Sequence, residues 1–183
     1  MRSFLFLADG FEEVEALTTV DVMRRAGMDV KTVSINADKT ATGAHGVSVT
    51  ADSTFEENGY ADAEWLILPG GMPGAVNLYE HEGLRRLLGA HILRGKVAAI
   101  CAAPAVVLAP LGILKDREAT CYPGFEMALA EGEAIYKDLP VVALNNVVTA
   151  NGPASATSFA LAIVANTMGA SVASEVAAGM LFA

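Results

Sequence analysis

The apolar run over residues 96–100, which ends at Cys101, constrains the fold of this chain more than any other feature. An uninterrupted apolar run without turn residues predicts a buried strand. Pro104 then opens a short helical run, because proline is tolerated in the first turn of a helix. A cysteine on such a strand-to-helix turn lies near the positive end of the helix, which favours thiolate over thiol. The alternative is a small, inert core residue, since free cysteine is among the most buried residue types.

Strand and helix patterns alternate along the rest of the chain. Strands are predicted over residues 4–8, 29–35, 64–68, 117–121, 141–144 and 147–150, and helices over 12–26, 82–93, 125–130 and 155–168. This alternation predicts an α/β fold with a mostly parallel central sheet and helices on both faces. Residues 40–52 predict a small β-hairpin. We see no repeat or linker, so residues 1–183 are predicted to form one domain.

Composition excludes several classes of partner. The net charge is −9 and no basic cluster exceeds two residues, so no nucleic-acid partner is expected. The first apolar segment stops at Asp9, too early for a signal peptide. The uncharged stretch over residues 97–114 is interrupted by Pro104 and Pro110, so no membrane span is expected either. We therefore predict a cytoplasmic protein.

The chain has few metal-ligating side chains outside its acidic residues. Its two cysteines, Cys101 and Cys121, make no disulfide scaffold and are too few for a structural zinc site. The three histidines, His45, His81 and His91, have polar neighbours and are predicted to be surface residues. We expect no metal and no cofactor.

Four loops with unusual residues leave the carboxyl ends of predicted strands, where ligands collect in parallel sheets. They cover residues 9–15, residues 69–74, Cys101 with Ala102, and residues 151–153. Gly70 and Gly71 let backbone N–H groups approach a ligand closely, as an oxyanion hole requires. The alternative is a plain chain reversal. The spacing matches neither a P-loop nor a dinucleotide fingerprint.

Three glutamates crowd the start of the first predicted helix, where the helix dipole favours negative charge. Capping or solvation explains Glu12 and Glu13. Glu15 borders the apolar stripe and precedes four uncharged residues, so burial is expected to let it hold a proton at neutral pH. A protonated carboxyl can donate a hydrogen bond to a thiolate.

These motifs together resemble the DJ-one/ThiJ/PfpI superfamily over nearly the whole chain. Residues 98–104 resemble its nucleophile elbow, residues 68–78 its glycine loop, residues 9–27 its first loop and helix, and residues 151–164 its last motif. The resemblance implies a flavodoxin-like three-layer sandwich and a homodimer. It also implies that Cys101 is the reactive cysteine and Glu15 its protonated partner.

The resemblance further implies a pocket and a substrate class. The residues implied to form the oxyanion and substrate pocket are Gly70, Gly71, Ala102, Tyr122, Asn151, Gly152 and Pro153. Members of this branch are described as protein or nucleotide deglycases, as cofactor-free glyoxalases and as oxidative-stress sensors. The partners expected are small reactive carbonyl compounds such as methylglyoxal, or glycated groups.

Two positions depart from the family pattern. Ala102 stands where protease-like members have a histidine, which argues against a Cys-His peptidase. Tyr122, before Pro123, stands where the animal protein of this branch has a histidine. A phenol with a pKa of about 10 cannot replace imidazole as a base at neutral pH. Any reaction must therefore rest on Glu15, water and the thiolate.

Three hypotheses remain open. In the first, the Cys101 thiolate adds to a carbonyl carbon and Glu15 moves protons between carbon and oxygen. In the second, the chain is an oxidative-stress sensor or redox chaperone whose Cys101 oxidises to sulfinate. Cys121 is then a plain core or strand-end cysteine rather than a resolving thiol. In the third, the chain is an α/β domain with an inert cysteine.

Overall fold

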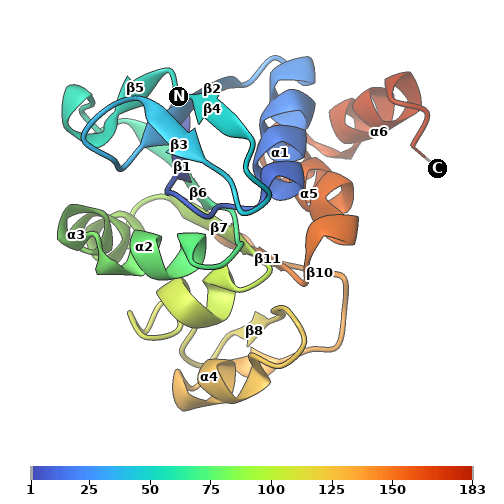
Figure 1. The fold of residues 1–183 in the computed structure, drawn as a ribbon. Coiled ribbons are helices and arrows are strands. Elements are labelled where there is room, and N and C mark those ends of the chain that lie inside the picture. The colour runs from blue at the N-terminus through green and yellow to red at the C-terminus, as the bar shows by residue number, and fades with distance from the viewer. Residues whose placement is uncertain (1, 183) are drawn as a thin grey trace.

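A central sheet organises the computed structural model, which describes residues 2–182 (Figure 1). Within this range the sheet has seven strands in the order β10-β11-β7-β6-β1-β2-β5. Only β10 is antiparallel to its neighbour, so the predicted mostly parallel sheet is confirmed. The strands are β1 (Arg2–Leu7), β2 (Asp29–Ser34), β5 (Ser53–Thr54), β6 (Ala63–Leu68), β7 (Lys96–Ile100), β10 (Val141–Ala143) and β11 (Val147–Ala150).

Helices cover both faces of the sheet, which confirms the three-layer sandwich (Figure 1). On one face lie α1 (Glu13–Arg25) and α5 (Ala156–Met168), with α6 (Ala170–Gly179) packed against α5. On the other lie α2 (Gly74–Glu80), α3 (Glu82–His91) and the single-turn η2 (Pro104–Leu108), with α4 (Glu126–Glu131) against η2. Short segments complete the fold: β3 (Thr40–Thr42), β4 (Ser48–Thr50), η1 (Phe55–Glu57), β8 (Glu118–Ala119), β9 (Ile135–Tyr136) and η3 (Pro153–Ser155).

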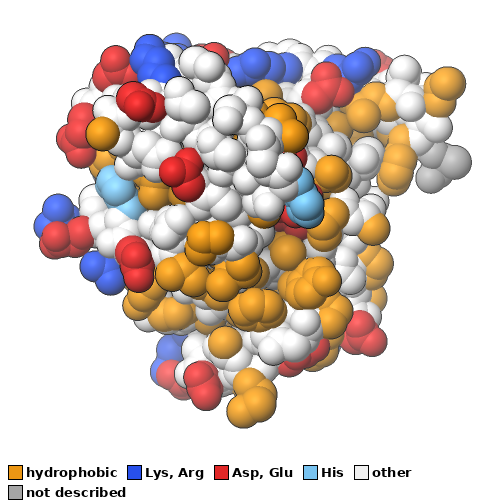
Figure 2. All heavy atoms as spheres, in the orientation of Figure 1, with side chains coloured by type: hydrophobic (Ala, Val, Ile, Leu, Met, Phe, Trp, Pro, Cys, Tyr) orange, Lys and Arg blue, Asp and Glu red, His pale blue; other side chains and the backbone are white. Residues whose placement is uncertain are grey.

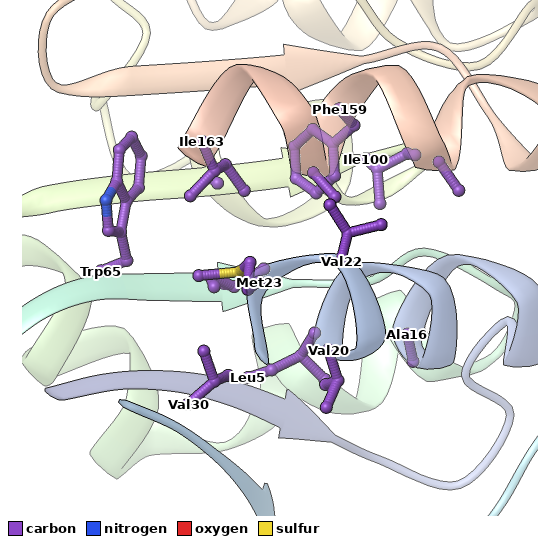
Figure 3. Close-up of a cluster of buried hydrophobic side chains, with 14 of the residues drawn as sticks. Leu5, Ala16, Val20, Val22, Met23, Val30, Trp65, Ile100, Phe159 and Ile163 are labelled. Atoms are coloured by element: carbon purple, nitrogen blue, oxygen red, sulfur yellow. The ribbon is translucent and has the colours of Figure 1, made fainter. Parts of the chain in front are cut away.

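Two apolar clusters form the core, one on each face of the sheet. Successive side chains of a strand point to opposite faces, so Leu5 of β1 belongs to one cluster and Phe4 to the other. Figure 3 shows the first cluster, in which Met23 of α1 and Phe159 of α5 lie against the strands. These side chains are almost wholly buried and fix both helices on the sheet.

The predicted elements are present with shifted ends, and the predicted small hairpin is β3 with β4. The elements that were not predicted include α2 within the glycine-loop stretch, α6, η1 and the short strands β5 and β9. None of the described helices is long and apolar enough to cross a membrane.

The prediction that His91 is a surface residue is wrong, because its side chain is only 1% exposed. Leu84, Leu88 and His91 are the buried residues of α3, and their spacing places them on one face of the helix. His91 Nε2 lies 3.3 Å from the carbonyl oxygen of Glu64, and Nδ1 has no partner among the described residues. Burial lowers the pKa of His91 below its ordinary value.

Candidate active site

Cys101 follows β7 directly and occupies a backbone conformation that side chains rarely adopt. Its φ is +65°, and its N–H donates to the carbonyl oxygen of Ala150 at the end of β11, at 2.8 Å. A non-glycine residue at positive φ costs free energy and is typical of a nucleophile on a strand-to-helix turn. The neighbouring strand therefore holds Cys101 at the carboxyl edge of the sheet, where the sequence predicted the site.

Gly70 brings Cys101 and Glu15 together. An added Cβ at Gly70 would lie 2.6 Å from the Cys101 Cβ and 2.9 Å from Glu15 Oε2. Only glycine fits between these two side chains. The Gly70 N–H donates to Glu15 Oε2 at 2.7 Å. The N–H that the oxyanion prediction assigns to Gly70 is thus already used, and the N–H groups of Gly71 and Ala102 remain.

Glu15 is completely buried in the first turn of α1. Burial raises the pKa of Glu15 to about 7, against the lowering effect of the hydrogen bonds from Gly70 and Cys101. Its second oxygen, Oε1, is buried without a partner among the described residues. A carboxyl group with this pKa exchanges a proton readily at neutral pH. The protonated form predicted from the sequence stays a prediction.

Burial opposes the thiolate that the sequence predicts for Cys101, and the charge state of Cys101 stays a prediction because it is coupled to that of Glu15. Burial raises the pKa of Cys101 to about 12, and the charge of Glu15 adds to this effect. Hydrogen bonds from the N–H groups of Gly71 and Ala102 lower the pKa but do not outweigh burial. The sequence pattern showed the helix and the N–H groups but not how little solvent reaches the sulfur, whose residue is 8% exposed. Cys101 and Glu15 therefore form one coupled pair, in which a charge on Glu15 disfavours a charge on Cys101.

The remaining predicted pocket residues lie on the segments next to Cys101. The Tyr122 N–H donates to the Cys101 carbonyl oxygen at 2.8 Å, and its ring lies against Gly152, where an added Cβ would be 3.2 Å away. The Asn151 side chain accepts a hydrogen bond from the Ser155 hydroxyl at 2.6 Å, which joins it to the following turn. Pro153 opens η3. Tyr122 and Gly152 therefore lie against each other next to Cys101, and Asn151 is joined to Ser155.

Cys121 differs from Cys101 in its surroundings. It is 1% exposed, and burial followed by the charge of Glu126 raises its pKa to about 12. No carboxyl group is hydrogen-bonded to it among the described residues, and its neighbours are core side chains. This agrees with the predicted plain core cysteine.

Glu12, Glu13 and His45 form a charged cluster beside the site. Their metal-ligating atoms all lie within 4.8 Å of one another. Glu13 Oε2 is 2.9 Å from His45 Nδ1, and Glu12 Oε2 is 3.6 Å from the same nitrogen. These contacts make the cluster an ion pair between groups of the chain, and we assign no metal to it. The capping or solvation predicted for Glu13 is wrong, since Glu13 is 8% exposed and caps no helix.

The surface around the site is more apolar than its surroundings. Figure 2 shows hydrophobic side chains gathered over the region of β7, β11 and β10, below a histidine and acidic side chains. Exposed apolar side chains near the site include Val14 and Met72, from two of the four loops, and Tyr122 on the segment next to Cys101. Such a rim suits small organic groups better than highly charged ligands.

Comparison with known proteins finds close likeness over the whole chain. The sequence model of the DJ-1/PfpI family matches residues 1–166. A Parkinson disease protein 7 homolog of Danio rerio is 36% identical over 183 residues, covering 98% of this chain and 96% of that protein. The putative cysteine protease YraA of Bacillus subtilis is 30% identical over 151 residues, covering 81% and 88%. The structure of oxidized Toxoplasma gondii DJ-1 superposes with a TM-score of 0.94 at 32% identity, covering 100% and 98%.

Proposed function

Because this chain belongs to the DJ-1/PfpI family, we propose that it is a cysteine-dependent enzyme acting on reactive carbonyl compounds. Its substrates are 2-oxoaldehydes such as methylglyoxal, or the adducts that they form on proteins and nucleotides. Cys101 is the nucleophile and Glu15 carries the proton.

One observation carries this proposal: Gly70 holds Glu15 against Cys101. The carboxyl group accepts the Gly70 N–H at 2.7 Å, and Gly70 leaves no room for a side chain between the two residues. The pKa of Glu15, raised by burial to about 7, lies near the optimum for a general base at neutral pH. A nucleophile with an adjacent base is the arrangement that covalent catalysis requires.

The raised pKa of Cys101 favours a concerted first step. As the Cys101 sulfur bonds to the aldehyde carbon, the Glu15 carboxylate takes the thiol proton and passes it to the carbonyl oxygen. Glu15 then removes the proton on that carbon, and reprotonation of the neighbouring carbon through an enediol gives a thioester of the 2-hydroxy acid. Water cleaves the thioester, releasing the acid and the Cys101 thiol. Overall, one 2-oxoaldehyde and one water give one 2-hydroxy acid, and no external oxidant or reductant is needed.

Turnover of methylglyoxal tests the proposal. We expect loss of 2-hydroxy acid formation in Cys101→Ser and in Glu15→Ala. Removing the nucleophile or its base costs at least about a hundredfold in rate. Cys121→Ser is the matched control and should turn over like the wild type. Equal turnover in all four proteins would exclude this function.

A second function is favoured by the N–H groups that surround the sulfur. The N–H groups of Gly71 and Ala102 lower the pKa of Cys101, and they are placed to stabilise an oxidised, negatively charged sulfur. On this account the chain is a sensor whose Cys101 takes two oxygen atoms from two molecules of peroxide, which are reduced to water. Mass spectrometry after mild peroxide should then find two added oxygens on Cys101 before Cys121. Oxidation of Cys121 first would contradict it.

Peptidase activity receives less support. The Bacillus subtilis relative is named a putative cysteine protease, but in this chain Ala102 follows Cys101 and offers no base. Glu15 is completely buried, whereas a peptidase must also bind an extended peptide beside its nucleophile. We therefore propose carbonyl chemistry rather than peptide hydrolysis. The cytoplasmic location expected from the sequence stays part of this proposal.

A further inference from the structure

The loop of the β3–β4 hairpin, residues 43–47, grips the carboxyl group of Glu13. Glu13 Oε1 accepts the backbone N–H groups of His45 at 2.8 Å and Val47 at 3.3 Å. Glu13 Oε2 lies 2.9 Å from His45 Nδ1. A Cβ at Gly43 would collide with the Glu13 carboxyl, so the loop closes directly over it. Three donors of the hairpin loop, which is distant from Glu13 in sequence, thus hold the Glu13 carboxylate.

Residues 10–12, which precede α1, are hydrogen-bonded both to the hairpin and to the glycine loop. The Gly10 N–H donates to the Thr42 carbonyl at 2.7 Å, and the Ala44 N–H donates to the Phe11 carbonyl at 2.8 Å. The Glu12 N–H donates to the Gly70 carbonyl at 3.0 Å. Residues 10–13 therefore lie between the hairpin and the glycine loop. Glu15 follows Glu13 by two residues in the first turn of α1, and its carboxyl group accepts the hydrogen bond from the Gly70 N–H.

The two carboxyl groups have opposite environments. Burial alone would raise the pKa of Glu13, but the hydrogen bonds from His45 and Val47 outweigh it and lower the pKa to about 2. Burial dominates at Glu15 and raises its pKa to about 7, with the charge of Glu12 adding to the rise. Glu13 thus stays a carboxylate throughout the neutral range, while Glu15 gains and loses a proton there. Glu13, a permanent carboxylate with three hydrogen-bond donors, is suited to anchor the chain. Glu15, which titrates near neutral pH, is suited to transfer a proton.

We propose that Glu13, anchored by the hairpin loop, is a positioning residue that holds Glu15 against Gly70 and Cys101. This inference rests on the proposed function, since it assigns a role in the same reactive pair. The hydrogen-bond partners of the Glu13 carboxyl among the described residues lie in the hairpin loop, so Glu13 acts by fixing the first turn of α1. Small displacements of a catalytic group have large effects on rate, so loss of the Glu13 anchor should lower the rate by letting Glu15 shift.

The test is the rate at which iodoacetamide alkylates Cys101, followed by site-resolved mass spectrometry from pH 5 to 8.5 with EDTA present. In the wild type the rate should rise with a midpoint near pH 7, because Glu15 must be ionised to take the thiol proton. Glu13→Gln should lower the rate at pH 8 about tenfold and move the midpoint down towards the ordinary glutamate value. In a Glu15→Gln background the same change should alter the rate by less than about twofold.

His45→Gln tests the anchor should Glu13→Gln fold poorly. It keeps the backbone donors and removes only the ring, so it should lower the rate in the same direction by about threefold. Glu133→Gln is the control, because Glu133 makes an exposed ion pair with Lys115 at 2.8 Å far along the chain. It should leave the profile unchanged.

Two outcomes would overturn the inference. One is a midpoint and rate unchanged in both Glu13→Gln and His45→Gln. The other is an equal loss of rate in the wild-type and Glu15→Gln backgrounds, which is the result of a merely structural role. If instead Glu15→Gln leaves the wild-type profile intact, the proposed function fails with it, and the anchor has no reactive pair to position.

Discussion

At the scale of single residues, Gly70 does what no other residue type could do between a thiol and a carboxyl group. It supplies an N–H to Glu15 and adds no side-chain atoms between Glu15 and Cys101. The sequence pointed to Gly70 and Gly71 as residues that allow close approach. It did not show that the approaching group at Gly70 is a carboxyl group of the chain itself.

Gly70→Ala should therefore separate the reactive pair. Its new Cβ must displace either the Cys101 Cβ or Glu15 Oε2, and a displacement near 1 Å costs about a hundredfold in rate. The rate of methylglyoxal turnover checks this. Gly89→Ala is the matched control, because a Cβ at Gly89 meets nothing within 4 Å and alanine is favoured in a helix. Unchanged turnover in Gly70→Ala would contradict the close contact.

Glu15 should also make the stability of the fold depend on pH. The pKa of Glu15 is about 7 in the folded chain and 4.5 as an ordinary value, so the folded state holds the proton more tightly. The free energy of unfolding then falls as the pH rises from about 4.5 to about 7 and is level above that. At pH 8 the loss is about 3 kcal/mol. Urea unfolding of the wild type and Glu15→Gln at pH 5 and pH 8 measures it, and equal pH dependence in both proteins would contradict the burial of a charged group.

At the scale of elements, periodicity predicted most of the strands and helices because burial and local pattern agree there. The apolar stripes of α1 and α3, and the uninterrupted runs of β6 and β7, repeat with the spacing of the structures they form. Helix α6 was missed because its alanine-rich sequence has no marked stripe, and α5 supplies the surface it needs. What pattern cannot give is long-range burial. That is why the burial of Glu13, His91 and Cys101 was not foreseen.

His91, at the end of α3, should make that element sensitive to acid. Burial lowers its pKa, so the unfolded chain binds the proton more readily than the folded one. Stability is therefore fully present above the ordinary pKa of 6.5 and falls as the pH decreases below it. Because Glu15 acts in the opposite direction over this range, the test uses a Glu15→Gln background, in which His91→Gln should reduce the loss of the urea midpoint between pH 7.5 and pH 5. An undiminished loss would place the acid-sensitive group elsewhere.

At the scale of the whole molecule, family membership carries an expectation about assembly. Because the family resemblance implies a homodimer, we predict one, with apolar side chains such as Val14 and Leu17 on the exposed side of α1 available for contact. Light scattering should give about 38 kDa, twice the 19.0 kDa of the chain. A mass near that of one chain would contradict this prediction.

The sheet, the glycine loop and the hairpin together hold one thiol beside one titrating carboxyl group. That pair is the central claim, and the pH profile of kcat/KM for methylglyoxal tests it most directly. We predict that kcat/KM of the wild type rises with a midpoint near pH 7, where Glu15 loses its proton, and that Glu15→Gln abolishes this rise. A profile that falls over this range, or one that persists unchanged in Glu15→Gln, would contradict it.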